Sequence, residues 1–414
     1  MNRQSKSLLA LACVLAPPLA WGNLLIDDGG THVFNSPVNE SVTLNNGSTL
    51  RVTSGGTITG DGSSITPSIP GFARGAIESG VGSNSDIFLE GNSVVSAGAA
   101  QVGISRMFAG ELHMGGNSVV NGGGIANTAL YAYGVTSPLF PPLPLRTFLT
   151  DDAVINGHVQ SDGYISISGN ALINGSLREA NAGMALDMDG GLITGGVQNV
   201  SLVEHTVMIR SGSILGGYVG ISTSLDFSMK GGTLEGGWLA NSRRMNVDLR
   251  GGDIDGGMVF GWFGDPTRVG SNVNIFGGSI DADLGGWLFD FTPSLDLTGS
   301  PALDCSANGN TFNIWGGQLG HASAGNGIHM NVCASLDVYG TNLNYSSGWL
   351  TGLLADGSLL NLSVTEGALW GGQIRLHDVS VPEPASLGLF GMALGAMTML
   401  RRRRLAVSDR SIES

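Results

Sequence analysis

Four stretches of the chain decide the fold: LDMDGGLITGG at 186–196, FSMKGGTLEGG at 227–237, VDLRGGDIDGG at 247–257 and VNIFGGSID at 273–281. Each stretch alternates apolar and polar residues and then reaches a glycine pair. This alternation predicts a β-strand with one buried face, and the glycine pair allows a positive-φ turn after it. The apolar–polar–apolar cores of this repeat begin at Ile165, Leu186, Val207, Phe227, Val247, Val273, Leu295, Phe312, Leu336 and Leu360, with weaker copies at Ile87, Leu112 and Val42.

The repeat predicts an all-β fold, a right-handed parallel β-helix (β-solenoid) with coils of roughly 20–26 residues. A leucine-rich repeat would need a helix or its own Leu/Asn framework, and a propeller blade would need a longer unit. Glycine supplies 67 of 414 residues, but in pairs and not at every third position, so the chain is not collagen-like. The body resembles pectin-lyase-like and adhesin-like β-helix repeat proteins.

The N-terminus predicts a signal peptide over residues 1–22. Arg3 and Lys6 are its positive charges, an apolar stretch covers residues 8–16, and the small residues Ala20 and Gly22 offer a cleavage site before Asn23. We therefore expect general export, with signal peptidase as a processing partner.

Near the C-terminus, an extended Pro-Glu-Pro segment precedes an apolar run at 387–400, which predicts a short transmembrane helix. The cluster of arginines that follows indicates a cytoplasmic end. The motif residues are Pro382, Glu383, Pro384, Arg401, Arg402, Arg403 and Arg404.

This arrangement, residues 381–404, resembles the PEP-CTERM sorting signal of Gram-negative bacteria. The resemblance implies that an exosortase, a membrane protease, recognises the Pro-Glu-Pro segment and processes an inner-membrane-anchored precursor. The product is then at the cell surface or extracellular, and such cargo accompanies exopolysaccharide and biofilm production. The family usually stops soon after the arginines, whereas this chain continues with a predicted cytoplasmic tail at 405–414.

Between the ends lies one predicted Gly-rich repeat region, residues 23–380, with a Pro-rich loop at 137–148. The net charge of −14 argues against binding to nucleic acid, because an acidic body repels phosphates. Phosphate loops, Gly-x-Ser-x-Gly elbows and His-Glu-x-x-His motifs are missing from the sequence, so we expect no cofactor.

One acidic column stands out because Glu235, Asp255 and Asp281 follow the strand cores at the same register. Carboxylates on neighbouring coils could bind Ca²⁺, or could act as the catalytic acids of a polysaccharide hydrolase or lyase. Solvated turn residues are the plainer interpretation. For a lyase, Lys230 and Arg250 share a strand position and are the nearest basic candidates.

Tyr218, Trp238 and Trp287 each follow a second glycine pair. Facing outward they would form a glycan-binding strip, and facing inward they would be a stacked core ladder, which we favour. Cys305 and Cys333 are the cysteines of the predicted exported body, so a disulfide is expected, although His321 and His329 leave a Cys-His-His-Cys metal site as an alternative.

The sequence as a whole predicts a non-enzymatic, structural or adhesive protein of the cell surface or extracellular matrix, associated with exopolysaccharide. The alternative is a β-helix polysaccharide hydrolase or lyase that uses the stacked carboxylates.

Overall fold

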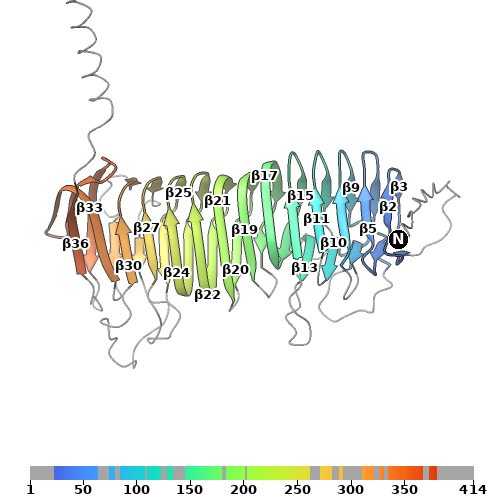
Figure 1. Cartoon of the computed structure of the whole chain (residues 1–414), viewed down its shortest axis with the longest axis horizontal. Coiled ribbons are helices and arrows are strands. Elements are labelled where there is room, and N and C mark those ends of the chain that lie inside the picture. The colour runs from blue at the N-terminus through green and yellow to red at the C-terminus, as the bar shows by residue number, and fades with distance from the viewer. Residues whose placement is uncertain are drawn as a thin grey trace, which may run out of the picture. The chain divides into compact units, whose positions relative to one another are not determined.

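The regular elements of the protein are β-strands throughout the ranges that the structure describes, and all but one of them pair in parallel like the coils of a solenoid (Figure 1). The chain divides into two compact units, Met1–Ala185 with Gly191–Gly195, and Leu186–Gly190 with Gly196–Ser414. Strand β19 (Met184–Ile193) has residues in both units. The computed structural model describes residues 23–63, 74–79, 84–107, 110–122, 128–133, 145–179, 183–200, 203–261, 271–281, 289–291, 310–320, 327–330, 334–366 and 373–379.

The first unit has three sides, each built of strands that pair in parallel with the equivalent strand of the next coil. Its first side consists of β1 (Leu24–Ile26), β4 (Val42–Leu44), β7 (Gly75–Ser79), β10 (Val102–Met107), β13 (Thr128–Tyr133), β16 (His158–Ser161) and β18 (Leu177–Arg178). Its second side consists of β2 (Thr31–Phe34), β5 (Thr49–Val52), β8 (Asp86–Leu89), β11 (Gly110–Met114), β14 (Leu145–Leu149) and the beginning of β17 (Gly163–Asn174). Its third side consists of β3 (Pro37–Val38), β6 (Thr57–Thr59), β9 (Val94–Ser96), β12 (Val119–Asn121), β15 (Val154–Asn156) and the end of β17.

The second unit repeats this plan with longer strands, some of which turn from one side to the next. Its first side consists of β20 (Val197–Val200), the beginnings of β22 (Tyr218–Met229) and β24 (Trp238–Leu249), β26 (Met258–Gly261), β29 (Phe289–Phe291), β32 (Gly327–Met330) and β35 (Leu359–Glu366). Its second side consists of β21 (Glu204–Ile214), the ends of β22 and β24, β27 (Asn272–Ile275), β30 (Asn310–Ile314), β33 (Ala334–Ser346) and β36 (Gln373–Asp378). Its third side consists of the end of β21, β23 (Thr233–Glu235), β25 (Asp253–Asp255), β28 (Ser279–Asp281) and β31 (Gln318–Leu319).

Stacking converts the alternation of each strand into continuous inward columns. On the third side of the first unit, one residue of each coil after the first falls in a column whose members are all fully buried. A single coil could not bury these side chains by itself, so neighbouring coils stabilise each other. The members are Ile58, Val95, Val120, Ile155 and Ile173.

The predicted strand cores of the second unit also form one inward column. Val207, Phe227, Val247, Val273, Phe312 and Leu336 follow each other in register on the second side, each at most 3 % exposed.

Two predicted cores do not belong to that column. Val273 pairs directly with Phe312, so the predicted core at Leu295 has no place between them. Leu360 lies in β35 on the first side, and the neighbour of Leu336 in the column is Ile374. Neighbouring residues of the column, such as Val273 and Phe312, are separated by very different lengths of sequence, which hides the true period.

The Pro-rich loop is also shorter than predicted. Leu145–Leu149 forms β14, which pairs with β11 and β17, and Leu145 is buried. The assignment of 145–148 to a loop was therefore wrong. Leu145, Thr147 and Leu149 share the buried face, so the strand alternates in burial although its residue types do not alternate in polarity. Residues 137–144 of the predicted loop lie outside the described residues.

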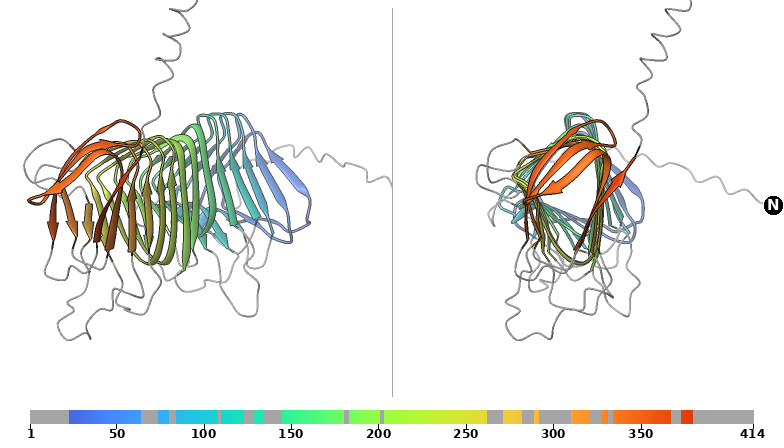
Figure 2. Two further views of the ribbon diagram at one scale, coloured as in Figure 1. Left: turned by 60° about the vertical axis from the view of Figure 1, so that its left-hand side comes forward. Right: turned by 90° about the vertical axis from the view of Figure 1, so that its left-hand side faces the viewer.

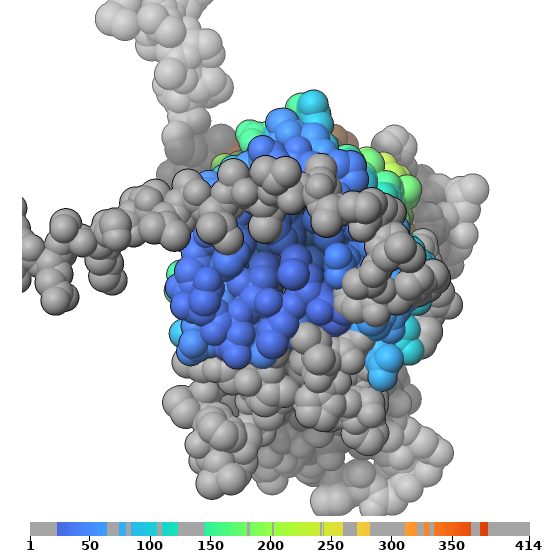
Figure 3. All heavy atoms as spheres, turned by 90° about the vertical axis from the view of Figure 1, so that its right-hand side faces the viewer, coloured from blue at the N-terminus to red at the C-terminus, as the bar shows by residue number. Residues whose placement is uncertain are grey.

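The two units have different ends. In Figure 3 the strands of the first coil, β1 to β3, form the end of the first unit, and no described strand precedes them. In the second unit, β34 (Trp349–Leu354) runs antiparallel to both β33 and β35 (Figure 2, right). These three strands form an antiparallel cap that interrupts the parallel stack before β36 pairs with β33.

Candidate functional site

The outward row on the second side of the second unit is polar, as the sequence predicts. Asp187, Asp248 and Asn274 lie in this row, half-buried between their neighbours. Arg210 pairs with Asp187, and Arg250 Nε donates a hydrogen bond to Asp248 Oδ2 at 2.8 Å. Each ion pair neutralises one aspartate of the row.

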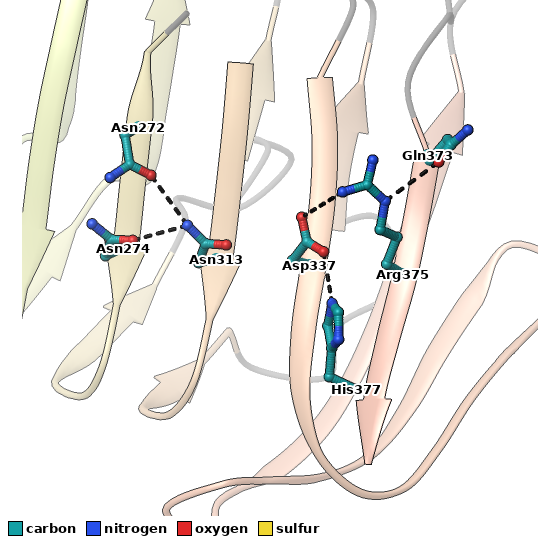
Figure 4. Close-up of polar contacts among 7 residues, drawn as sticks. All are labelled: Asn272, Asn274, Asn313, Asp337, Gln373, Arg375 and His377. Atoms are coloured by element: carbon teal, nitrogen blue, oxygen red, sulfur yellow. Dashed lines mark hydrogen bonds and ion pairs between the residues drawn. The ribbon is translucent and has the colours of Figure 1, made fainter. Parts of the chain in front are cut away.

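Further along the row, amide side chains bridge neighbouring coils. Asn313 Nδ2 on β30 donates to Asn272 Oδ1 at 3.1 Å and to Asn274 Oδ1 at 2.9 Å, both on β27 (Figure 4). The first unit has a similar amide ladder on its third side, where Asn156 Nδ2 donates to Asn121 Oδ1 at 2.9 Å and Asn121 Nδ2 donates to Ser96 Oγ at 3.1 Å. Such ladders satisfy polar groups between coils and fix the register.

The row ends in a charged cluster on the last two strands of this side. Asp337 on β33 has only 6 % of its side chain exposed, and its Oδ1 accepts a hydrogen bond from His377 Nε2 on β36 at 2.7 Å. Arg375 Nη1 lies 3.7 Å from Asp337 Oδ2, and Arg375 Nε donates to Gln373 Oε1 (Figure 4). Two side chains of β36 therefore converge on one buried carboxylate.

An aromatic ladder runs beside this polar row. Phe276, Trp315, Tyr339 and His377 stack in sequence, with ring centroids 6.2, 3.6 and 4.4 Å apart and nearly parallel planes. The guanidinium of Arg250 lies 4.8 Å above the Phe276 ring. Burial raises the pKa of Tyr339, and the charge of Asp337 adds to this effect while Arg375 opposes it. Because the rings cover each other's faces, the ladder presents ring edges to solvent.

This aromatic ladder was not predicted, although the sequence carries a signal for it. Each ring lies three residues after the first residue of a strand core, at Val273, Phe312, Leu336 and Ile374. The misplaced cores at Leu295 and Leu360 broke the register that would have aligned the rings.

The first unit carries a comparable ladder on its second side. Phe88, His113 and Phe148 stack with ring centroids 4.7 and 4.6 Å apart. The guanidinium of Arg51 lies 4.7 Å over Phe88 and also pairs with Glu90. Ring stacking and charge pairing between neighbouring coils stabilise the outer surface as apolar columns stabilise the core.

The acidic column has the geometry that the sequence predicts. Glu235 pairs in register with Asp255, and Asp255 pairs with Asp281, on the consecutive strands β23, β25 and β28. Glu235 and Asp255 are exposed, and Asp281 is half-buried. The three carboxylates thus form a ladder on the surface of the third side.

Among the described residues, no metal site is assembled around this column. Across the described ranges, no three His, Cys, Asp or Glu side chains converge closely enough to hold a metal ion. Lys230 and Arg250 do share a strand position, since they follow the paired residues Met229 and Leu249. Arg250, however, is engaged with Asp248 and the Phe276 ring.

Of the two alternatives for the aromatic residues after the glycine pairs, the structure shows the favoured inward ladder for Tyr218 and Trp238 and not the outward glycan strip. Tyr218 and Trp238 pair in register with Met258, and each aromatic side chain is only 1 % exposed. Their rings stack 6.1 Å apart and contact Phe227. They form an inward ladder that no ligand can reach. Met258 pairs with Phe289, so Phe289 takes the place in the column that we assigned to Trp287, which lies outside the described residues.

Several predicted features lie outside the described residues. These include Cys305, Cys333 and the sorting motif, with Pro382, Glu383, Pro384 and Arg401 to Arg404, as well as the signal peptide at 1–22 and the apolar run at 387–400. In the part of the chain that is described, no helix has both the length and the apolar character needed to cross a membrane.

Comparison with known proteins gives one match. Residues 380–404 match the family model of the PEP-CTERM protein-sorting motif, which confirms the resemblance inferred from the sequence. No curated protein and no solved structure matches the chain. The match begins directly after Val379, the residue whose amide donates to the Gly340 carbonyl at 2.8 Å beyond β36. The chain thus carries a PEP-CTERM sorting motif immediately after its last described strand, and this motif indicates a protein that an exosortase sorts to the cell surface.

Proposed function

We propose that the protein is a structural and adhesive component of the cell surface or extracellular matrix, associated with exopolysaccharide. A signal peptide at 1–22 directs export, and a helix at 387–400 anchors a precursor in the inner membrane with residues 405–414 in the cytoplasm. An exosortase then processes the anchor. The observation that carries this proposal is the sorting motif at 380–404.

The remaining body, residues 23–380, acts in this proposal as a right-handed parallel β-helix without catalytic activity. Its parallel coils, amide ladders and ion pairs support a mechanical role, because they link neighbouring coils to one another. A disulfide between Cys305 and Cys333 would further stabilise it after export.

Replacing Pro382, Glu383 and Pro384 with alanine tests the sorting step. We expect the variant to remain uncut in the inner membrane, measured by fractionation and by the mass of the accumulated chain. A matched control replaces Ser408, Asp409 and Arg410, which lie beyond the matched residues, and should be processed normally. Unchanged surface delivery of the first variant would contradict the proposal.

A polysaccharide hydrolase or lyase is a second candidate, supported by the shared register of Glu235, Asp255 and Asp281. Light scattering of the host's exopolysaccharide, mixed with the purified surface protein with and without calcium, tests it. A fall in polymer mass that Asp255→Asn abolishes would establish the enzyme. A constant or rising mass would favour the structural role.

A further inference from the structure

The antiparallel cap of the second unit presents a regular outer face that the parallel coils do not share. β34 is its central strand, and directly opposed residues of antiparallel strands lie on the same face. Thr351 is opposed by Asn344 on β33 and by Asn361 on β35. Leu353 is opposed by Leu359 on β35, and Trp349 lies at the other end of β34. We call the outward side of these residues the cap face.

Burial shows which side of the cap faces solvent. Leu350, Leu360 and Leu362 are at most 2 % exposed and close the end of the core. The residues that alternate with them point outward, so Trp349 is 46 % exposed and Leu359 is 72 % exposed. The cap thus seals the core with one side and displays large apolar groups on the other.

The cap face is uncharged, in contrast to the rows of ion pairs on the second side. Its apolar ends are separated by the amide and hydroxyl groups of Asn344, Thr351 and Asn361. The nearest carboxylate in the connecting turn, Asp356, is directed to the body: its Oδ2 accepts a hydrogen bond from Gly317 N at 2.7 Å. Asp356 Oδ1 accepts another from Ser358 N. In a chain with a net charge of −14, a face without basic groups selects against anionic polymers.

We infer that the cap face binds a neutral polysaccharide. A sugar ring has apolar C–H faces that pack on an aromatic ring, and a rim of hydroxyls that pair with amides. Trp349 provides the aromatic surface, and Asn344 and Asn361 provide donors and acceptors at the centre of the face. The four-residue separation of Trp349 and Leu353 spans about 13 Å along β34, long enough for a short stretch of a linear glycan.

A second copy of the chain fits this face less well. A stable protein interface buries roughly 800 Å² on each partner around a continuous apolar centre. Here a polar row separates Trp349 from the Leu353–Leu359 pair. The inference deepens the proposed function, on which it rests for the location of the cap outside the cell.

Affinity electrophoresis tests the inference with the processed protein purified from the cell surface. Native gels would contain hydroxyethyl cellulose, galactomannan or dextran as neutral polymers, and alginate as an anionic one. We expect retardation by at least one neutral polymer, persisting at raised salt, and none by alginate. Trp349→Ala and Asn361→Ala should each weaken it, the first by about tenfold. Phe276→Ala, which removes an exposed aromatic ring away from the cap, should leave the retardation unchanged.

Three outcomes would overturn the inference: no retardation by any neutral polymer, equal retardation of the Trp349→Ala protein, or a dimer in sedimentation that Trp349→Ala dissolves. The last would assign the face to a second copy. If the Trp349→Ala protein folds poorly, the Asn361→Ala protein still tests the inference. Surface labelling of the same cells reports delivery separately, so a failure of glycan binding and a failure of sorting can be distinguished.

Discussion

Asp337 and His377 join the last two strands on the second side of the second unit. The carboxylate of Asp337 is nearly buried, and it accepts a 2.7 Å hydrogen bond from the His377 side chain on β36. β36 is the final described strand, and the match to the sorting motif begins two residues after its end, at residue 380. The pair therefore anchors the strand from which the sorting motif emerges.

Replacing Asp337 with alanine should loosen β36 without unfolding the coils before it. The substitution removes the acceptor for His377 and the ion pair with Arg375, whose partly exposed side chains limit the loss to about 1–3 kcal/mol. Hydrogen exchange of residues 373–379 measures the effect. Asp253→Ala, which removes an exposed carboxylate of β25, is the control and should leave that segment unchanged. Equal exchange in the two variants would contradict the anchoring role.

We expect the first unit to lose stability in acid because Asp61 becomes protonated. Burial by itself would raise the pKa of this carboxyl, but hydrogen bonds from Ser63 and Ser41 outweigh it and lower the pKa to about 2. A lowered pKa in the folded state stabilises the fold above the unfolded pKa of about 3.9, and this contribution disappears as the pH falls toward 2. Allowing for solvent screening, it amounts to roughly 1–2 kcal/mol.

Hydrogen exchange of the Ser41 and Ser63 amides between about pH 5 and pH 3 measures this contribution. Protection should fall with pH in the native protein and much less in the Asp61→Asn variant. Asp27→Asn, which alters an exposed carboxylate, serves as the control and should keep the native slope. Parallel slopes for all three proteins would show that Asp61 does not control the local stability.

Two glycines with similar φ angles should tolerate alanine differently: Gly232, which belongs to a glycine pair between coils, and Gly357, which lies in a turn. Gly232 has φ of +84°, and a Cβ there would lie 2.5 Å from the Gly212 carbonyl oxygen of the neighbouring coil. Gly357 has φ of +87°, and a Cβ there would meet no atom within 4 Å. Gly357→Ala should cost about 1 kcal/mol from backbone strain alone, and Gly232→Ala about 2–4 kcal/mol because the coils must separate. Urea unfolding of the second unit compares them, and equal midpoints would refute the role of close stacking.

The sequence predicts the parallel stack and the inward columns because alternation and glycine pairs recur wherever coils follow each other closely. The same reasoning places Glu235, Asp255 and Asp281 correctly on consecutive strands. It fails at Leu360-Asn361-Leu362, which alternates like Leu336-Asp337-Val338 although it belongs to the antiparallel cap. Alternation reports that one face of a strand is buried, and it carries no information on the direction of the neighbouring strand.

The sequence also does not predict whether a side chain next to a glycine pair points inward or outward. The turn interrupts the period of two, so counting along the strand no longer assigns Tyr218 to the inside or the outside. Only the neighbouring coil decides it: Trp238 stacks on Tyr218, and Phe227 contacts both rings from the adjacent strand segment.

Two tryptophans of the second unit provide the last prediction. Trp238→Ala removes a side chain that is 1 % exposed and should destabilise the unit by about 3–5 kcal/mol, because a cavity remains between Tyr218 and Met258. Trp349→Ala removes a side chain that is 46 % exposed and should change stability by less than about 1 kcal/mol. Urea unfolding followed by circular dichroism measures both effects. Circular dichroism is preferred to tryptophan fluorescence because each variant loses a tryptophan. Similar shifts for both variants would mean that Trp238 reaches solvent, and the outward strip would then have to be reconsidered. The expected difference instead leaves Trp349, of these two tryptophans, available to a ligand, because a side chain enclosed by the coils cannot contact a polymer outside them.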